Sequence, residues 1–194
     1  MSINSVCVYC GSANRVAEPY KQLARAVGEA LAVRNKHLIY GGGRVGLMGI
    51  VADAALAAGG KVTGIIPQHI QSREIQHTGI TELIVVEDMH TRKRMMVERA
   101  DAFVILPGGF GTLDETFEIL TWKQLQLHAK PIVIFNGLQY WDKLIELMRH
   151  LVMSGFAQPA NLEMFTVVSD LDAMFAALEA SRAASDSDVV TKWM

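Results

Sequence analysis

A glycine-rich segment with an acidic end contains the residue types best suited to chemistry. Residues 107–115 read PGGFGTLDE and follow directly after the apolar run at residues 102–106. Glycines let the backbone approach a ligand closely, and free N–H groups at a helix N-terminus attract anions. Because a carboxylate repels phosphate, we expect Glu115 to act on a part of the ligand away from the phosphate. The segment therefore predicts a phosphorylated substrate with chemistry near its sugar.

A basic segment precedes this turn. Residues 89–95 read MHTRKRM and follow a predicted strand, at the edge of a parallel sheet where ligands bind. Arg92 could therefore reach the same crevice as Glu115, and an arginine fork suits bidentate contact with phosphate or carboxylate. The alternative for the basic residues is a solvated helix face. Similarly, Glu115 and Glu118 share one helix face and could be two solvated acids near a helix N-terminus.

A second glycine run lies earlier in the chain. Residues 41–46 read GGGRVG and match the G-x-G-x-x-G spacing of dinucleotide sites. The run follows the second predicted strand rather than the first, and no acidic residue for a ribose hydroxyl occurs near Ile65, about 20 residues further on. An NAD site is therefore disfavoured, and either another ligand or a tight turn explains the glycines. The sequence contains no P-loop or G-x-S-x-G motif, and its histidines have no metal-ligand spacing.

The elements that must position these residues alternate between strand-like and helical patterns. This alternation predicts an α/β, Rossmann-like, doubly wound and mostly parallel sheet of about seven strands flanked by helices. The predicted strands are 5–9, 37–40, 61–66, 82–86, 102–106, 132–135 and 166–168, and the predicted helices are 18–34, 46–58, 91–100, 112–127, 140–153 and 170–180. Glycine turns follow the first, second and fifth strands, so we expect all three turns to meet at one crevice.

The composition fits one domain over residues 1–180 and a polar C-terminal tail, residues 181–194, that frays. The net charge of −2 disfavours nucleic-acid binding. There is no run of about 18 apolar residues and no signal-peptide pattern, so we expect no membrane span and a cytoplasmic location. Cys7 and Cys10 would lie about 10 Å apart along a strand, too far for a disulfide, which favours buried strand residues over a redox or metal pair.

Taken together, these segments resemble the LONELY GUY (LOG) family. Its P-G-G-x-G-T-x-x-E signature matches residues 107–115, and its M-H-x-R-K and A-D-A-F segments match residues 89–93 and 100–103. The CGS at residues 10–12 and the GGGRVGLMG at residues 41–49 also match. The resemblance covers residues 5–180, with no departure at the signature positions.

The resemblance implies a function. The family consists of cytokinin riboside 5′-monophosphate phosphoribohydrolases, formerly labelled lysine decarboxylases. It implies hydrolysis of the N-glycosidic bond of AMP or an N6-substituted (cytokinin) riboside 5′-monophosphate to free base and ribose 5-phosphate, by a homodimer without metal or cofactor. The implied catalytic residues are Arg92 and Glu115. The implied substrate-binding residues are Gly11, Ser12, Gly43, Gly46, Met89, Lys93, Gly108, Gly109, Gly111 and Thr112.

The chemistry of the residues is consistent with this reaction. Breaking the C1′–N9 bond develops positive charge on the ribose, and a carboxylate such as Glu115 can stabilise that charge and activate water. Arg92 would orient the nucleotide or help the base to leave. Two alternatives stay open: a non-catalytic nucleotide or molybdenum-cofactor carrier of related fold, and an NAD-linked enzyme. The sequence does not distinguish adenine from prenylated adenine, or cytokinin production from nucleotide salvage.

Overall fold

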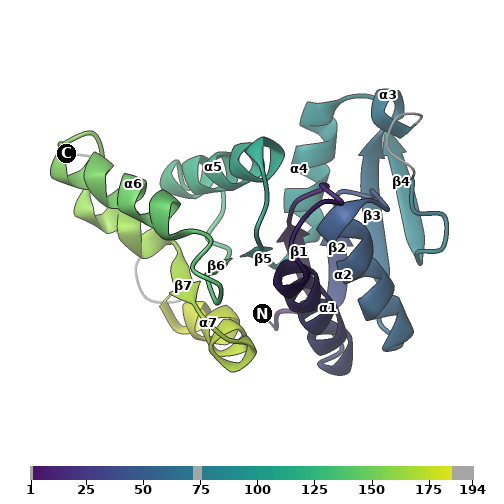
Figure 1. The fold of residues 1–194 in the computed structure, drawn as a ribbon. Coiled ribbons are helices and arrows are strands. Elements are labelled where there is room, and N and C mark those ends of the chain that lie inside the picture. The colour runs from purple at the N-terminus through teal and green to yellow at the C-terminus, as the bar shows by residue number, and fades with distance from the viewer. Residues whose placement is uncertain (1, 72–75, 185–194) are drawn as a thin grey trace.

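The computed structural model describes residues 2–71 and 76–184, and within them the chain forms a seven-stranded sheet (Figure 1). The strand order is β4-β3-β2-β1-β5-β6-β7, and every pairing is parallel. The strands are β1 (Ser5–Tyr9), β2 (His37–Tyr40), β3 (Val62–Pro67), β4 (Glu82–Val86), β5 (Ala102–Ile105), β6 (Ile132–Phe135) and β7 (Thr166–Val168). This confirms the predicted Rossmann-like fold class.

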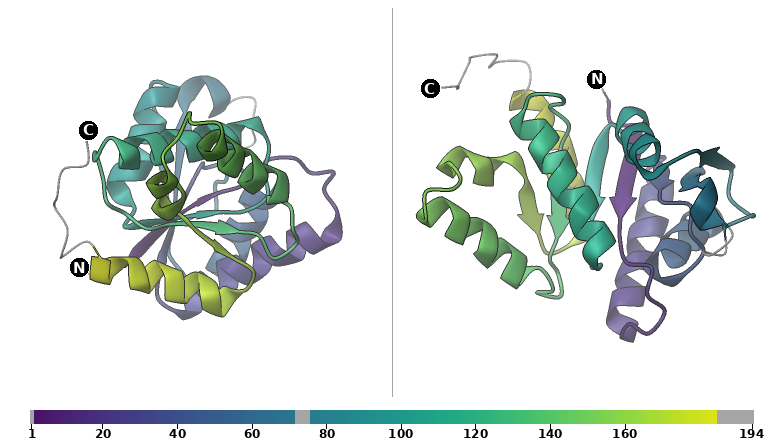
Figure 2. Two further views of the ribbon diagram at one scale, coloured as in Figure 1. Left: turned by 90° about the vertical axis from the view of Figure 1, so that its left-hand side faces the viewer. Right: turned by 90° about the horizontal axis from the view of Figure 1, so that it is seen from above.

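Helices cover both faces of the sheet (Figure 2). Their bounds are α1 (Glu18–Val33), α2 (Gly46–Ala57), α3 (Gln68–Gln71), α4 (Met89–Arg99), α5 (Phe110–Gln124), α6 (Asp142–Met153), the 3-10 helix η1 (Pro159–Met164) and α7 (Leu171–Ala184). Helices α1, α2 and α7 pack on one face, and α4, α5 and α6 pack on the other. The sequence did not predict α3 and η1, because elements this short show no helical period.

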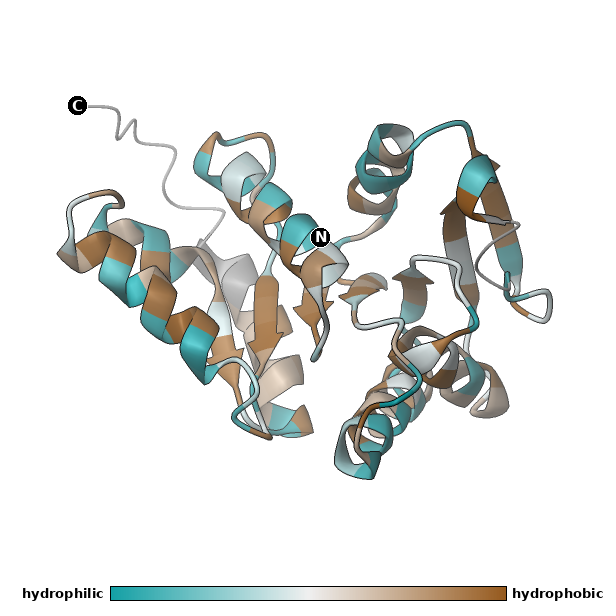
Figure 3. Cartoon of the chain, turned by 45° about the horizontal axis from the view of Figure 1, so that its top comes forward, coloured by the Kyte–Doolittle hydropathy of each residue, from teal (hydrophilic) through white to brown (hydrophobic). Residues whose placement is uncertain are grey.

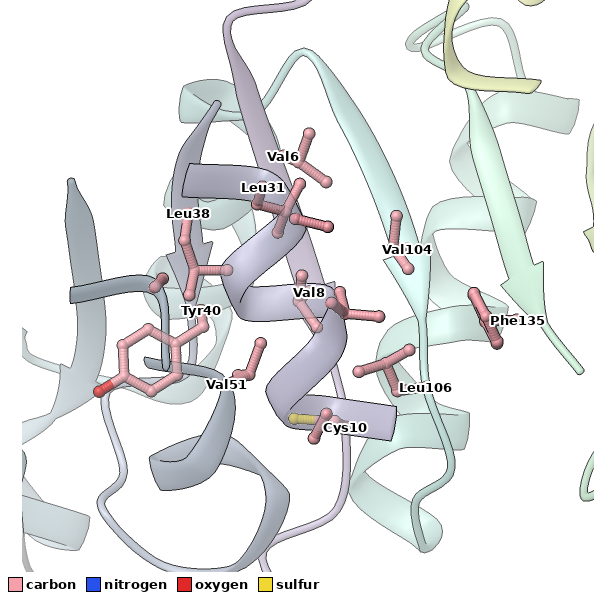
Figure 4. Packing of buried hydrophobic residues seen from close by; sticks show 14 of the residues in the cluster. Val6, Val8, Cys10, Leu31, Leu38, Tyr40, Val51, Val104, Leu106 and Phe135 are labelled. Atoms are coloured by element: carbon pink, nitrogen blue, oxygen red, sulfur yellow. The ribbon is translucent and has the colours of Figure 1, made fainter. Parts of the chain in front are cut away.

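The strands separate two hydrophobic cores. In β1, Val6 and Val8 point into the core under α1, α2 and α7 (Figure 4), whereas Cys7 and Tyr9 point into the core under α4, α5 and α6. All five residues of β1 are buried, which is why this strand reads as a continuous apolar run. Hydrophobic residues dominate the central strands, while the helices carry mixed faces (Figure 3). As expected, Cys7 and Cys10 are free and buried.

The order of strands reverses between β1 and β5. The chain continues from β1 towards β2 on one side of this point and from β5 towards β6 on the other. The turns that follow the two strands are in contact, since the amide of Gly11 donates a 3.0 Å hydrogen bond to the carbonyl of Pro107. Ligands of open α/β sheets bind in the crevice at such a reversal.

Several predicted boundaries differ from the structure by one to four residues, including the start of α4 and the end of α7. Helix α4 begins at Met89, two residues earlier than predicted, because the Asp88 side chain caps it by accepting a 2.7 Å hydrogen bond from the amide of Thr91. Helix α7 continues to Ala184, so it includes the first residues of the predicted tail, and residues 185–194 lie outside the described residues. None of the helices in the described ranges is both long and apolar enough to cross a membrane.

Candidate active site

A cavity of about 460 Å³ lies beyond the C-terminal ends of the central strands. The three predicted glycine turns meet there, contributing Gly11, Gly41 and the Gly108–Gly109 pair to its wall. The other lining residues come from the same turns, from the end of β3, from the starts of α1, α2, α4 and α5, from α3, and from the loops before α1 and α6: Cys10, Ser12, Ala13, Val16, Tyr20, Leu47, Met48, Ile66, Pro67, Ile70, Met89, Arg92, Pro107, Phe110, Gly111, Thr112, Glu115 and Tyr140.

Arg92 and Glu115 form an ion pair at the base of this cavity. Nη1 of Arg92 donates a 2.7 Å hydrogen bond to Oε1 of Glu115, and the two side chains are only 11% and 10% exposed. Nε of Arg92 donates to the carbonyl of Ile65 at the end of β3, at 3.0 Å. Burial raises the pKa of the Glu115 carboxyl, and the charge of Arg92 offsets only part of that rise. The cavity therefore contains a carboxylate suited to accepting a proton.

Gly41 makes room for the arginine. A Cβ atom at this position would collide with Nη2 of Arg92, so the guanidinium lies directly against the backbone after β2. From the sequence, the glycine run was expected to serve another ligand or a tight turn, and its contact with Arg92 was not predicted. The feature of the sequence that could have indicated this contact is the first glycine of the run, which directly follows a buried strand. A glycine is needed here because of close approach between an arginine and the backbone.

The N-terminus of α5 also borders the cavity. The first intrahelical hydrogen bond runs from the amide of Leu113 to the carbonyl of Gly109, so the N–H groups of Phe110, Gly111 and Thr112 have no partner within the helix. No side chain caps this end. Free N–H groups and the helix dipole together favour an anion at this position, as the sequence predicted.

Lys93 lies away from the cavity wall. Its Nζ is 3.1 Å from Oδ2 of Asp114 and 3.1 Å from Oε1 of Glu118, so it ties α4 to α5. Burial alone would lower the pKa of Lys93, but the hydrogen bonds that its ammonium group donates to the two carboxylates outweigh this effect and raise the pKa. The pairing also separates the two glutamates of α5: Glu118 binds Lys93, whereas Glu115 lines the cavity.

Gly43 and Gly46 also lie behind the wall rather than among the described residues that line the cavity. Gly43 pairs with Gln76 in an isolated bridge. The amide of Gly46 donates a 2.9 Å hydrogen bond to Oδ1 of Asn14, and its Cα packs closely against the backbone of Ser12. The remaining predicted site residues do line the cavity: Gly11, Ser12, Met89, Arg92, Gly108, Gly109, Gly111, Thr112 and Glu115.

Several residues that line the cavity were not predicted from the sequence. Tyr20 of α1 and Tyr140 after β6 bring aromatic rings to the cavity, and Ile66 and Ile70 bring aliphatic side chains. Tyr140 follows a strand at the ligand edge of the sheet, so the rule that located Arg92 could have found it. Tyr20 carries no such signal.

Cys10 also lines the cavity but is buried. Burial, followed by the charge of Glu115, raises the pKa of its thiol. The thiol therefore stays protonated and is a poor nucleophile.

Comparison with solved structures identifies the same architecture. The molybdenum cofactor carrier protein from Chlamydomonas reinhardtii is 20% identical with a TM-score of 0.71, and the alignment covers 94% of this chain and 99% of that one. The molybdenum cofactor binding protein from Rippkaea orientalis is 18% identical with a TM-score of 0.68, over 93% and 98% of the two chains. At these identities the likeness shows the fold alone.

Comparison of sequences is more specific. A family model described as possible lysine decarboxylase matches residues 48–178. A cytokinin riboside 5′-monophosphate phosphoribohydrolase from Rhodococcoides fascians is 46% identical over 175 residues, which cover 90% of this chain and 88% of the relative. The enzyme of the same name, LOG5, from Arabidopsis thaliana is 38% identical over 189 residues, or 97% and 83% of the two chains. On these similarities, the chain belongs to the LOG family.

Proposed function

We propose that the protein hydrolyses the N-glycosidic bond of AMP or of an N6-substituted adenosine 5′-monophosphate, releasing the free base and ribose 5-phosphate. The observation that carries this proposal is the buried Arg92–Glu115 pair, which shares one cavity with the free N–H groups of α5. The names of the two relatives support the same reaction. The proposal assigns residues 1–180 to a single nucleotide-binding domain.

The reaction needs a group that opposes positive charge on the ribose. As the C1′–N9 bond breaks, its electron pair leaves with the base and the ribose becomes cationic. Water then bonds to C1′ and gives up a proton, and the departing base takes up a proton, so that the products are the free base and ribose 5-phosphate. Glu115 would stabilise the cation and accept that proton, and its raised pKa brings the carboxylate closer to the ideal for a general base near neutral pH.

Arg92 would orient the nucleotide through the part of its guanidinium that the protein leaves available. An arginine carries five N–H donors. The hydrogen bonds to Ile65, Met89 and Glu115 all start from Nε or Nη1. The donors on Nη2, beside Gly41, are therefore the ones placed to contact phosphate, ribose or base.

The lining of the cavity offers groups for both the phosphate and the base of a nucleotide. The turn at Gly108–Thr112 would bind the 5′-phosphate, with Gly11 and Ser12 completing that wall. The base would lie against the apolar side chains of the lining, which include Met48, Ile66, Ile70 and Met89. Such a lining favours a base with an apolar N6 substituent, because burying it removes hydrocarbon from water. Gly43, Gly46 and Lys93 would support the wall from behind.

A chromatographic assay tests this function directly. The purified protein is incubated in EDTA with AMP, with N6-isopentenyl AMP and with other base-modified monophosphates, and released base is separated from nucleotide. We expect free base from at least one substrate, with the N6-isopentenyl compound cleaved more efficiently than AMP. Intact nucleotide throughout the panel would contradict the proposal, and tight binding without cleavage would favour a carrier.

We also propose a homodimer that assembles through α5. Thr116, Ile119 and Leu120 point into the core, whereas Phe110 is 92% exposed and Phe117 is 38% exposed. A spacing of seven residues places the two phenylalanines on the same helix face. A second copy covering this face would also border the cavity, because Phe110 lines it. Light scattering should give twice the chain mass, and Phe117→Asp should give a monomer; a monomeric wild type would contradict the proposal.

A further inference from the structure

We infer that Tyr140 is a positioning residue for the phosphate-binding turn. Its hydroxyl donates a hydrogen bond to the carbonyl of Gly108. This contact keeps the N–H group of Gly109, which belongs to the same peptide unit, directed away from the tyrosine. This inference rests on the proposed function, since it assumes that the turn binds the 5′-phosphate of the substrate.

The contact is a short hydrogen bond between two distant parts of the chain. Oη of Tyr140 donates to the carbonyl of Gly108 at 2.7 Å, linking the loop after β6 to the turn after β5. The neighbouring carbonyl, that of Pro107, accepts a 3.0 Å hydrogen bond from the amide of Gly11. Both carbonyls that precede the N-cap of α5 are therefore fixed by protein donors.

Fixing a carbonyl also fixes the N–H group of the same peptide unit. The peptide bond is planar and trans, so its C=O and N–H bonds point in opposite directions. When Tyr140 holds the Gly108 carbonyl, the Gly109 N–H must point away from the tyrosine. Directed away from the tyrosine, the Gly109 amide would add to the N–H groups of Phe110 and Gly111 as a donor for an anion.

This peptide needs an external restraint. Gly108 packs closely against Thr112 and the backbone of Gly11, but glycines adopt both signs of φ readily, so rotation about the Gly109 side of the plane between Gly108 and Gly109 meets less steric resistance than it would at another residue type. Nothing lies within 4 Å of a Cβ built at Gly109, and no side chain caps the helix there. A rotated plane would present a carbonyl oxygen to the phosphate. The Tyr140 hydroxyl is the described group that opposes this rotation through the Gly108 carbonyl.

Tyr140 is itself held firmly. Oδ1 of Asn136 accepts a 2.7 Å hydrogen bond from the amide of Trp141, and Nδ2 of Asn136 donates to Asp142 at 2.7 Å, which fixes the loop. The Tyr140 ring packs edge-on against Trp141, with centroids 4.8 Å apart, and against Tyr20, with centroids 5.5 Å apart. The hydroxyl is therefore presented on a preorganised ring.

The test removes one oxygen atom. Tyr140→Phe keeps the ring contacts and deletes only the donor. The matched control is Tyr40→Phe, which deletes a buried hydroxyl that has no hydrogen-bond partner among the described residues. Calorimetry measures the affinity for ribose 5-phosphate, and steady-state kinetics measure kcat and KM for AMP and adenosine in all three proteins.

For Tyr140→Phe we expect the affinity for ribose 5-phosphate to fall about tenfold, the usual effect of losing one hydrogen bond. We expect kcat/KM for AMP to fall at least as much, and that for adenosine to stay unchanged, because only AMP carries the phosphate. Tyr40→Phe should match the wild type in each measurement. Unchanged affinity for ribose 5-phosphate, or an equal loss of kcat/KM for AMP and adenosine, would overturn the inference.

The two proposals fail in different ways. A wild type that binds ribose 5-phosphate but never releases base contradicts the proposed hydrolysis, and the affinities of the two variants still decide the role of Tyr140. A wild type that hydrolyses AMP, together with an unaffected Tyr140→Phe variant, contradicts the role of Tyr140 alone. A wild type that does not bind ribose 5-phosphate overturns the inference about Tyr140.

Discussion

Nη1 of Arg92 on α4 lies 2.7 Å from Oε1 of Glu115 on α5, and both side chains are almost fully removed from water. Taking two charges out of water costs several kcal/mol per ion, and a buried pair regains this only with good geometry and further hydrogen bonds. Here Arg92 donates one such further hydrogen bond to the carbonyl of Ile65. A buried ion pair is weak evidence for stability, so its place in a cavity is better explained by chemistry on a bound nucleotide.

Glu115→Gln should abolish most of the turnover. Glutamine keeps the shape of the side chain but loses the negative charge that opposes the cationic ribose. Loss of one preorganised electrostatic group lowers kcat by about 100- to 1000-fold, or about 3–4 kcal/mol. Glu118→Gln is the matched control, because Glu118 pairs with Lys93 outside the cavity. Circular dichroism should show both variants folded, and a kcat near that of the wild type in folded Glu115→Gln would refute the assigned role.

As the pH is lowered, the activity should begin to fall at a higher pH than it would with a glutamate of ordinary pKa. Burial raises the pKa of Glu115 above its usual value of 4.5, and the carboxylate works only when ionised, so activity is lost as the pH falls through the raised pKa. The charge of Asp114 contributes to the rise. Asp114→Asn should therefore move the acidic limb of kcat/KM for AMP to lower pH. A limb that moves upward or stays fixed would argue that another group titrates.

The sheet was predictable because its five central strands, β1, β2, β3, β5 and β6, are buried on both faces. Five of the strands, including β1 and β6, have the bounds that their apolar runs predict. Helix ends were less predictable, because local contacts set them: the Asp88 side chain caps the start of α4, whereas α5 starts after Gly109 with no side-chain cap.

Within the site, strand ends located Arg92 and Glu115, but the orientation of neighbouring side chains needed the packed structure. Arg92 and Lys93 are adjacent on α4, yet one lines the cavity and the other joins α4 to α5. Successive residues project in different directions around a helix, and tertiary packing sets how the helix is rotated. The contact between Tyr140 and Gly108, 32 residues apart, likewise has no local signature.

Gly41→Ala should damage catalysis through Arg92. The new methyl group would collide with Nη2 of Arg92, so the guanidinium must move and loosen its hold on Glu115. Displacement of a catalytic group by about 1 Å can lower kcat by about 100-fold. Gly79→Ala is the control, since its nearest neighbour would be 3.4 Å away. If Gly41→Ala is folded and fully active, the close approach of Arg92 to the backbone is not needed for turnover.

Lys93→Met should act mainly on the stability of the fold and only slightly on KM for AMP. Lys93 joins α4 to α5 through Asp114 and Glu118, and hydrogen bonds between charged groups contribute about 1.5–3 kcal/mol each at most. We expect the free energy of unfolding in urea at pH 7 to fall by about 1–3 kcal/mol. Because the pKa of Lys93 is raised above its usual value of 10.5, the lysine contributes fully to stability below pH 10.5. This contribution is lost as the pH rises through the raised pKa. A large rise in KM for AMP at unchanged stability would instead place Lys93 on the substrate.

The enzyme should require a 5′-monophosphate and act poorly on the nucleoside. The N–H groups of Phe110, Gly111 and Thr112 lack helical partners, and Thr112 is buried in the turn. A site built to bind a polar group rejects an analogue that lacks it by up to about 10⁴-fold, because the donors are left unpaired. Binding energy from the remote phosphate also helps to position C1′, so kcat should fall as well as KM rise.

Comparison of AMP with adenosine in the wild type and in Thr112→Val measures this requirement. Valine keeps the branched shape of threonine and removes the hydroxyl, so the preference for AMP in kcat/KM should shrink in the variant while kcat/KM for adenosine stays the same. Ribose 5-phosphate should inhibit the wild type competitively against AMP, because both would occupy the turn at the start of α5. Similar kcat/KM for AMP and adenosine in the wild type would show that Gly108–Thr112 is a structural corner of the fold, and the phosphate would then have to bind elsewhere in the cavity.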